Sequence, residues 1–225
     1  MVRRVLLIDS HKLVRDGIHV ILERSGQFRV EAEADNSNDA LQIARQSSCD
    51  LAVLGVEAVG LPEQELTRQL VENCSLPVIV LSSRDDEHSV VAALRSGASA
   101  YLLKQVSAGE FLDALHRVAE DGSYLGPQVH EHLIAHIRRG DSGERLTSSG
   151  SFRLTPRELE VLRLVTDGHA SVEISHMLGL SVATVRSYRK SVMKKLGVNH
   201  VAALIQIAVR EGLTRWTHSA SGSYT

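Results

Sequence analysis

Polar and charged residues follow several short apolar runs in the first 120 residues, and their side chains could do chemistry together. Their functional groups are one carboxylate, two hydroxyls and one ammonium, carried by Asp9, Ser10, Ser82 and Lys104. The apolar run Leu51–Leu54 is followed instead by Gly55, which has no side chain. Position 55 therefore supplies neither a nucleophile nor a metal ligand.

The apolar runs alternate with stretches of helical spacing, such as Leu13 to Leu22 and Ala40 to Ala44, which indicates repeated β-α units. Five such units predict an α/β doubly wound domain with a five-stranded parallel sheet. In this architecture the functional crevice lies at the carboxyl ends of the strands, so the residues above should meet there. The expected strands are Val5–Ile8, Phe28–Val30, Leu51–Leu54, Val78–Leu81 and Tyr101–Leu103.

The C-terminal part of the chain carries clear helix boundaries. Thr155-Pro156-Arg157-Glu158 supplies an N-cap, a first-position proline and a reciprocal glutamate, which begin a helix that Gly168 can end. Two short helices joined by a turn at Gly179, the second one basic, then describe a helix-turn-helix in an all-α, four-helix domain. The later helices are expected at 171–178, from the cap Ser181 to about Leu196, and at 201–210.

The third of these helices has an apolar side and a basic side. At 100° per residue, Val182, Val185, Val192 and Leu196 gather on one side, and the opposite arc holds Arg186, Ser187, Lys190, Ser191 and Lys194. No acidic residue occurs between Glu173 and Glu211, which is typical of a surface that meets a phosphate backbone. Arg189 falls on the apolar side and ranks lower, although its stem could carry the charge out to a phosphate.

These motifs resemble, over nearly the whole length, a response regulator of the NarL/FixJ type. Leu7-Ile8-Asp9-Ser10-His11, Ser82 and Tyr101-Leu102-Leu103-Lys104 match receiver motifs, with Tyr101 at the switch-aromatic position. Leu154–Glu158, Thr184-Val185-Arg186 and Lys195–Val198 resemble the LuxR-type output domain. The resemblance implies a flavodoxin-like receiver at 1–120, a linker with a short helix at 121–152, a DNA-binding domain at 153–214 and a tail at 215–225.

The resemblance also implies roles for individual residues. Base contacts fall on Arg186, Ser187 and Lys190, and phosphate contacts on Thr184 and Lys194, with Arg189 and Ser181 as further candidates. Relatives dimerise through the last helix, which implies a homodimer on a two-fold symmetric operator in double-stranded DNA. The seam would consist of Val201, Leu204, Ile205 and Ala208, which could equally pack against their own domain.

Two positions depart from the receiver pattern and indicate a degenerate receiver. Gly55 stands where the phosphate-accepting aspartate belongs, and Ser10 replaces the second acid of the pair that binds Mg²⁺. Magnesium dehydrates reluctantly and prefers several oxygen ligands, so Asp9 alone is a poor site. We therefore expect no metal or other cofactor, and Lys104 should pair with Asp9 or point to solvent. Two other carboxylates could be considered as phosphate acceptors. Glu57 lies in the loop just after Gly55, whereas Asp50 is at the opposite end of the same strand and would lie roughly 16 Å from Gly55.

Charge is divided between the two halves of the chain. Residues 151–225 carry ten Lys/Arg and five Asp/Glu, a net +5, and residues 1–150 carry 15 and 22, a net −7. No apolar run approaches the roughly 18 residues of a membrane span, and Val5–Ile8 is too brief for a signal peptide. We expect a cytoplasmic protein with no membrane partner. Cys49 and Cys74 fit a reducing compartment, and a redox bridge between them stays open.

Between the two predicted domains, Gly and Ser accumulate from Gly140 to Ser151, which is typical of a flexible linker. A short helix from Gln128 to Arg138 is expected before it. Three histidines lie in this helix, and the last two are i, i+4 neighbours able to share a metal. They are His130, His132 and His136. Surface histidines are the simpler interpretation.

The sequence therefore predicts a sequence-specific DNA-binding transcriptional regulator whose receiver acts without aspartyl phosphorylation. A ligand or a partner protein at the receiver would supply the signal. Two alternatives remain open: a phospho-switched regulator with an unusual acceptor, and an interaction protein that titrates a partner regulator and barely binds DNA. The spacing of the histidines, serines and cysteines suggests no catalytic triad, so an enzyme is not expected.

Overall fold

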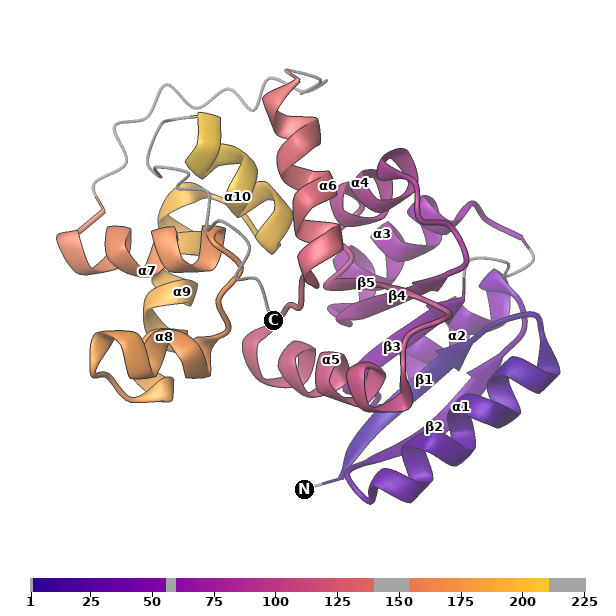
Figure 1. Ribbon diagram of the computed structural model, residues 1–225. Helices are drawn as coiled ribbons and strands as arrows, with labels where there is room; N and C mark the ends of the chain where they lie inside the picture. Colours follow the sequence, from indigo (N-terminus) through magenta and orange to yellow (C-terminus); the bar gives the residue numbers. More distant parts are fainter. Residues whose placement is uncertain (1, 56–59, 140–153, 211–225) are drawn as a thin grey trace, which may run out of the picture. The chain divides into compact units, whose positions relative to one another are not determined.

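The computed structural model describes residues 2–55, 60–139 and 154–210 (Figure 1). They divide into two compact units. The first unit holds all strands of the sheet together with helices α1 to α6, and the second holds α7 to α9 and the larger part of α10. No single helix in these ranges is long and apolar enough to span a membrane, and the bent pair of α9 and α10 passes that test only when taken together.

The first unit is built on a parallel sheet with the strand order β2-β1-β3-β4-β5. This order confirms the predicted doubly wound fold, and every expected strand is present. Its strands are β1 (Arg3–Ile8), β2 (Phe28–Ala34), β3 (Leu51–Gly55), β4 (Val78–Ser82) and β5 (Ala100–Leu103). Its helices are α1 (Lys12–Ser25), α2 (Ser37–Gln46), α3 (Glu63–Cys74), α4 (Glu87–Arg95), α5 (Ala108–Asp121) and α6 (Pro127–Arg138).

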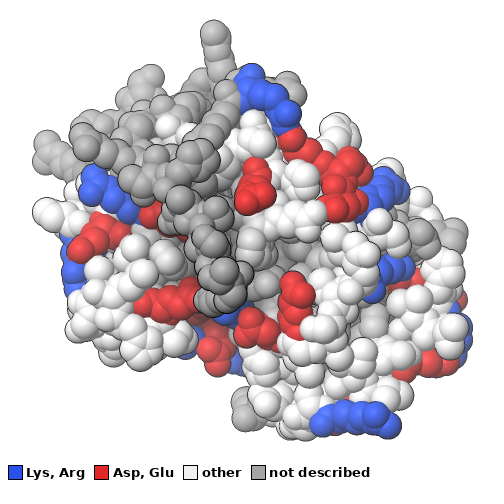
Figure 2. Space-filling model, viewed as in Figure 1, with Lys and Arg blue, Asp and Glu red and all other residues white. Residues whose placement is uncertain are grey.

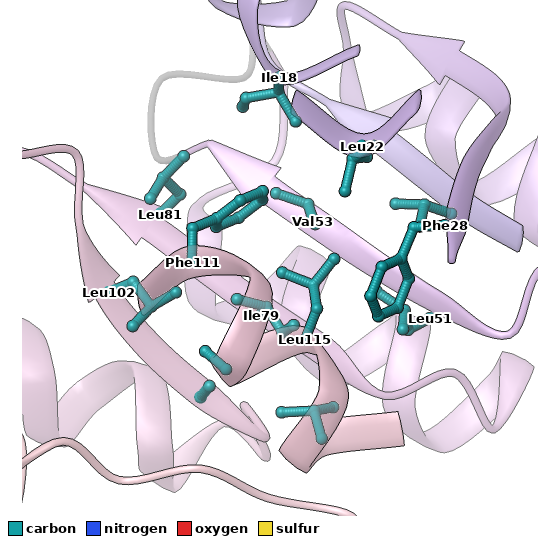
Figure 3. Close-up of a cluster of buried hydrophobic side chains, with 14 of the residues drawn as sticks. Ile18, Leu22, Phe28, Leu51, Val53, Ile79, Leu81, Leu102, Phe111 and Leu115 are labelled. Atoms are coloured by element: carbon teal, nitrogen blue, oxygen red, sulfur yellow. The ribbon is translucent and has the colours of Figure 1, made fainter. Parts of the chain in front are cut away.

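Helices α1 and α5 cover one face of the sheet, where they enclose a large apolar core (Figure 3). Because successive strand side chains point to opposite faces, alternate strand residues such as Val53 and Leu81 join Phe111 and Leu115 in this core. Burying each large apolar side chain stabilises the fold by about 1.5–3 kcal/mol. Tyr101, between the core residues Ala100 and Leu102, points to the other face of the sheet and is only 1% exposed.

Helix α6 belongs to the first compact unit rather than to a free connection between the units. It begins one residue before the expected Gln128 and ends at the expected Arg138, and it packs against α4. The Gly- and Ser-rich stretch predicted to be a flexible linker lies almost wholly in 140–153, outside the described residues. The start of α4 is fixed by Asp86, whose carboxylate accepts a hydrogen bond from the amide of Ser89 at 2.9 Å.

The second unit contains the helices that the sequence predicts, at nearly the predicted boundaries. They are α7 (Pro156–Thr166), α8 (Ser171–Leu178), α9 (Val182–Leu196) and α10 (Val201–Arg210). The predicted capping box is present: the Glu158 amide donates to Thr155 Oγ1 at 3.3 Å, and the Thr155 amide donates to Glu158 Oε2 at 2.7 Å. Gly179 and Gly197 adopt left-handed backbone angles, with φ of 62° and 67°, after α8 and α9.

Glu158 also ties α7 to α9. Its carboxylate, 4% exposed, accepts hydrogen bonds from Ser191 Oγ and Lys195 Nζ, both at 2.7 Å. The hydrogen bond from Lys195, followed by that from the Thr155 amide, lowers the pKa of Glu158 to about 2. One buried carboxylate therefore closes the helix cap and orients the basic helix at the same time.

The two cysteines are free thiols at different places in the first unit. Cys49 lies before β3, and its Sγ is 3.2 Å from Ser47 Oγ. Burial raises the pKa of the Cys49 thiol, so the reactive thiolate is disfavoured there.

We predict that Glu158→Gln weakens the second unit in a pH-dependent way. Because the pKa is lowered on folding, the ionised carboxylate stabilises the unit fully above about pH 4.5, and this contribution is lost as the pH falls towards about 2. The measurement is the free energy of unfolding of wild type and variant from pH 2 to 6, followed through NMR signals of α7 and α9. The difference between them should shrink to near zero at the acid end.

Glu160→Gln is the matched control, since Glu160 lies on the same helix and contacts Arg157 rather than α9. The difference in free energy of unfolding between Glu160→Gln and wild type should stay almost constant from pH 2 to 6. A Glu158→Gln profile parallel to that of Glu160→Gln would contradict the role assigned to Glu158.

Candidate functional sites

The carboxyl ends of four strands bring the predicted residues together in one place, which we call the crevice: Asp9, Gly55, Ser82 and Lys104. Strands β1 and β3 are neighbours, with Ile8 paired to Leu54, so Asp9 and Gly55 adjoin directly. Strand β4 follows β3, and Ser82 pairs with Leu103, the residue before Lys104. The expected convergence at the carboxyl edge of the sheet is confirmed.

The carboxylate of Asp9 occupies the space that a side chain at position 55 would need. A Cβ atom on Gly55 would overlap Asp9 Oδ2 and lie 2.6 Å from Asp9 Cγ. Asp9 is only 1% exposed, so its carboxylate is turned into the molecule rather than towards solvent. A glycine at position 55 is what allows this placement.

Asp9 is held there by partners on both of its oxygens. Lys104 Nζ donates to Oδ2 at 3.0 Å, and the amide of His11 donates to Oδ1 at 2.8 Å. His11 Nδ1 also lies 3.0 Å from Oδ1. Burial opposes ionisation of Asp9, but the His11 amide and Lys104 outweigh it and lower the pKa of the carboxyl. The expected pairing of Lys104 with Asp9 is confirmed, and the alternative of a solvent-exposed lysine is not.

His11 and Arg15 belong to this site, although the sequence alone does not single them out. Arg15 donates to the backbone carbonyl of Asp9 at 2.6 Å and to Glu33 at 3.0 Å. The position of His11, two residues after an aspartate that directly follows a strand, fits a turn in which the aspartate side chain accepts the later amide. Ser10 is half-buried beside them, and its Oγ lies 3.4 Å from His11 Nδ1.

A second set of hydrogen bonds fixes the loop between β4 and α4. The amide of Arg84 donates to Ser82 Oγ at 3.0 Å, and Tyr101 Oη donates to the carbonyl of Arg84 at 2.8 Å. The amide of Lys104 donates to the Ser82 carbonyl at 2.7 Å. Ser82 is fully buried, so the crevice and this loop share one rigid residue. Glu57, the other acceptor considered, lies outside the described residues.

In the second unit, α9 presents a polar face as the helical wheel predicts. Ser187, Lys190 and Lys194 are exposed, whereas Val185 and Val192 are buried. Arg186 and Thr184 lie at the margin and are half-buried. Thr184 and Ser181 hydrogen-bond each other, with 2.7 Å between their hydroxyl oxygens, and Ser181 caps the helix through the Thr184 amide at 3.1 Å.

Two basic residues of α9 serve the packing of the helices instead. Arg189 is 8% exposed, and its guanidinium lies 3.4 Å from Ser171 Oγ of α8. The sequence left open whether the stem of Arg189 carries the charge to the surface, and the structure shows that it does not. Lys195, inside the basic stretch, pairs with Glu158. The surface that can meet a polyanion is narrower than the sequence of α9 indicates.

Comparisons with known proteins agree with this architecture. Residues 5–116 match the family described as response regulator receiver domain, and residues 153–208 match bacterial regulatory proteins, luxR family. Transcriptional regulatory protein DegU from Brevibacillus brevis is 31% identical over 93% of this chain and 94% of its own length. MctR from Rhizobium johnstonii is 34% identical over the same shares. The chain is a response regulator of the NarL/FixJ type.

Solved response regulators share the fold. A chain of RcsB from Salmonella typhimurium is 26% identical, with a TM-score of 0.56 over 93% of this chain and 100% of that one. RcsB from the same serovar, bound to a promoter in the presence of the phosphomimetic BeF₃⁻, is 26% identical, with a TM-score of 0.55 over 90% of this chain and 96% of that one. The chain is thus a transcriptional regulator with a receiver and a luxR-type output domain.

Magnesium, which the resemblance to receivers implies, does not fit the residues of this receiver. Among the described residues the crevice has one carboxylate, that of Asp9, and both of its oxygens already accept hydrogen bonds, from Lys104 and from His11. Gly55 contributes no side-chain ligand, and Ser10 offers a hydroxyl in place of a second carboxylate. A hard cation that needs several oxygen ligands would have to displace the ammonium of Lys104 first.

The remaining predicted residues of the regulator lie as follows. Val201, Leu204, Ile205 and Ala208 of α10 are each at most 6% exposed in the single chain, and their role as a dimer seam stays a prediction. His130 is buried, whereas His132 and His136 face Asp85 and Glu87. Among the described residues, no group of three or more His, Cys, Asp and Glu side chains could hold a metal ion.

We predict that Gly55→Ala destabilises the receiver by about 1–3 kcal/mol, because the added methyl group overlaps the carboxylate of Asp9, which is fixed by its partners. Chemical unfolding of the full chain, followed by circular dichroism, measures the change. The matched control is Gly17→Ala in α1, where a Cβ meets nothing within 4 Å. That substitution should stabilise the receiver by about 0.5–1 kcal/mol. A stability gain in both variants would show that Asp9 moves aside freely.

Proposed function

We propose that this regulator binds double-stranded DNA sequence-specifically through α9 and acts without aspartyl phosphorylation of its receiver. The exposed face of α9 carries Ser187, Lys190 and Lys194, with Arg186 beside them, and no carboxylate interrupts it. Such a basic helix, second in a helix-turn-helix, fits the major groove. The promoter complex of RcsB supports the same role for the related unit here.

Within α9 the exposed residues have different proposed tasks. Arg186, Ser187 and Lys190 read base edges, and arginine and lysine favour the O6 and N7 atoms of guanine. Lys194 and Thr184 contact phosphates, which position the helix without reading sequence. Ser181 contributes mainly as the cap of α9. Arg189 orients α8 against α9 rather than touching DNA.

The regulator acts as a homodimer on a two-fold symmetric operator in this proposal. One solved structure contains two RcsB dimers bound to two parallel DNAs. A seam through Val201, Leu204, Ile205 and Ala208 requires α10 to turn that buried face outward. The proposed segments are a receiver at 1–120, a linker with α6 at 121–152, the DNA-binding domain at 153–214 and a tail at 215–225, in a cytoplasmic protein.

The proposal of a phosphorylation-independent receiver depends on the pair of Asp9 and Lys104. A receiver that accepts a phosphoryl group needs a carboxylate at the end of β3, whereas here Asp9 fills that space and neutralises Lys104. The ammonium that would meet a phosphoryl anion already has a buried partner. A ligand or a partner protein, rather than phosphorylation, then supplies the signal at the crevice.

We predict that acetyl phosphate leaves the protein unmodified, because Gly55 has no acceptor carboxylate and the Asp9 carboxylate is already paired with Lys104. Intact mass spectrometry after incubation with acetyl phosphate and Mg²⁺ measures this directly, and operator binding should be the same before and after. A stable mass increase of one phosphoryl group that disappears in Glu57→Gln would instead establish an unusual acceptor.

We predict that Arg186→Ala and Lys194→Ala weaken DNA binding in different ways. Loss of Arg186 should cost about 1–3 kcal/mol at the operator and relax base preference at one position of each half-site. Loss of Lys194 should weaken specific and non-specific DNA alike and reduce the salt slope by about one per subunit. Titrations of operator DNA and of non-specific DNA across a salt series separate the sequence-dependent loss from the uniform one.

Lys12→Ala, which removes a lysine of the receiver that pairs with Asp16, is the charge-matched control and should change neither property. If Arg186→Ala and Lys194→Ala give the same uniform loss with unchanged base preference, the proposed orientation of α9 is wrong. If the full chain shows no salt-dependent DNA binding at all, the interaction-protein alternative replaces this function.

A further inference from the structure

A histidine at the β2 edge of the receiver sheet lies between two carboxylates. His19 of α1 has its Nδ1 atom 3.2 Å from Glu33 Oε1 of β2 and its Nε2 atom 3.1 Å from Glu23 Oε1 of α1. Arg15, one helical turn before His19, donates to the other oxygen of Glu33 at 3.0 Å. We call these four side chains the α1–β2 cluster. Figure 2 shows basic and acidic side chains along the side of the first unit where Figure 1 places α1.

A register shift in β2 turns Glu33 towards α1. Val30 packs on the core that α1 covers, so in a regular strand position 33 would point to the opposite face of the sheet. The pairing of β2 with β1 instead skips Glu31, which lies between the paired residues Val30 and Ala32. Such an extra residue re-aims the side chains that follow it. The local backbone of β2 therefore presents the Glu33 carboxylate to the helix.

Both ring nitrogens of His19 face carboxylate oxygens, and this arrangement favours the protonated ring. A neutral imidazole has one N–H group and can donate to one of the two carboxylates, whereas an imidazolium has two and can donate to both. The neutral ring would turn a lone pair towards the second carboxylate. In agreement with this geometry, hydrogen bonding to Glu33 and then to Glu23 raises the pKa of His19 and outweighs the opposing effect of burial.

The partner of His19 on β2 keeps its negative charge at neutral pH. Burial opposes ionisation of Glu33, but the hydrogen bonds from Arg15 and His19 outweigh it and lower the pKa of this carboxyl. Helix α1 packs against β2 and α5. Further titratable and charged groups of these elements have partners of their own, which are Lys12 with Asp16 on α1, Arg29 with Glu31 on β2, and His116 of α5 with Phe28. Within the cluster, His19 is therefore the group that exchanges a proton near neutral pH.

We propose that protonated His19 stabilises the packing of α1 on β2, and that loss of its proton weakens this packing, so that the receiver responds to pH. Because the pKa of His19 is raised on folding, the contribution is complete below about 6.5, the ordinary value for histidine, and is lost as the pH rises above it. Glu33 also orients Arg15, which donates to the backbone carbonyl of Asp9 at 2.6 Å. The α1–β2 cluster thereby connects the pH of the solution to the backbone beside the crevice.

NMR of the full-length protein tests the protonation of His19 first. The ring nitrogen signals of His19 should be those of an imidazolium at acid pH, and the midpoint of their titration should fall in Glu33→Gln. Glu31→Gln is the matched control on the same strand, since Glu31 pairs with Arg29, and it should leave the midpoint of His19 unchanged. A midpoint that is the same in wild type and in Glu33→Gln would overturn the proposal.

Amide hydrogen exchange of the full-length protein tests the packing of α1. After correction for the intrinsic effect of pH, the protection of α1 amides in the wild type should fall by about twofold to fivefold from about pH 5.5 to about pH 8.5, the range expected for a partly exposed ion pair. His19→Lys keeps a positive charge and should stay protected at both pH values. His19→Asn should show the lower protection at both. His176→Asn, at an exposed position of α8, is the control and should keep the pH dependence of the wild type.

Protection of α1 that does not depend on pH in the wild type, or that keeps its pH dependence in His19→Asn, would overturn the proposal. Low protection at both pH values in His19→Lys would overturn the role of the charge. Amides of β3 and β4 should stay protected in every variant, which shows that the receiver is folded. The measurements use neither DNA nor a phosphodonor, so their failure would leave the proposed DNA-binding function standing, and failure of DNA binding would leave the role of His19 standing.

Discussion

A buried carboxylate held by a distant lysine is the constraint on which each unit of this protein depends. In the receiver, Asp9 joins β1 to Lys104 after β5, across a separation of 95 residues. In the output unit, Glu158 joins α7 to Lys195 at the end of α9, across 37 residues. Each carboxylate also accepts a backbone amide close by in sequence, from His11 or Thr155. Removing Lys104 would leave the charge of Asp9 buried without its partner, which costs about 3–5 kcal/mol.

The two pairs serve opposite ends of the proposed function. In the receiver, Asp9 occupies the volume next to Gly55 and forms an ion pair with Lys104. The pair in the output unit leaves the recognition surface intact, because it uses Lys195 for packing and leaves Lys190 and Lys194 exposed. An ion pair thus occupies the crevice of the receiver, and an ion pair of the same kind orients α9 in the output unit.

The sequence predicts the strands, the capping box and the four helices of the output unit because their signals are local. Alternating apolar runs, Thr155 with Glu158, and the glycines after α8 and α9 act over a few residues. The overlap of the Asp9 carboxylate with position 55, the pairing of Lys195 with Glu158 and the docking of α6 on α4 could not be predicted, because each joins residues far apart in the chain. Resemblance located Gly55, but only the structure shows which atom fills its space.

The overlap between Asp9 and position 55 has a consequence for how this receiver can change over generations. A carboxylate introduced at position 55 would lie against Asp9 and leave Lys104 between two carboxylates, so this change alone lowers stability. A second acid at Ser10 would add repulsion until a cation arrives to bind all three. Each of these changes is therefore unfavourable unless the others occur with it.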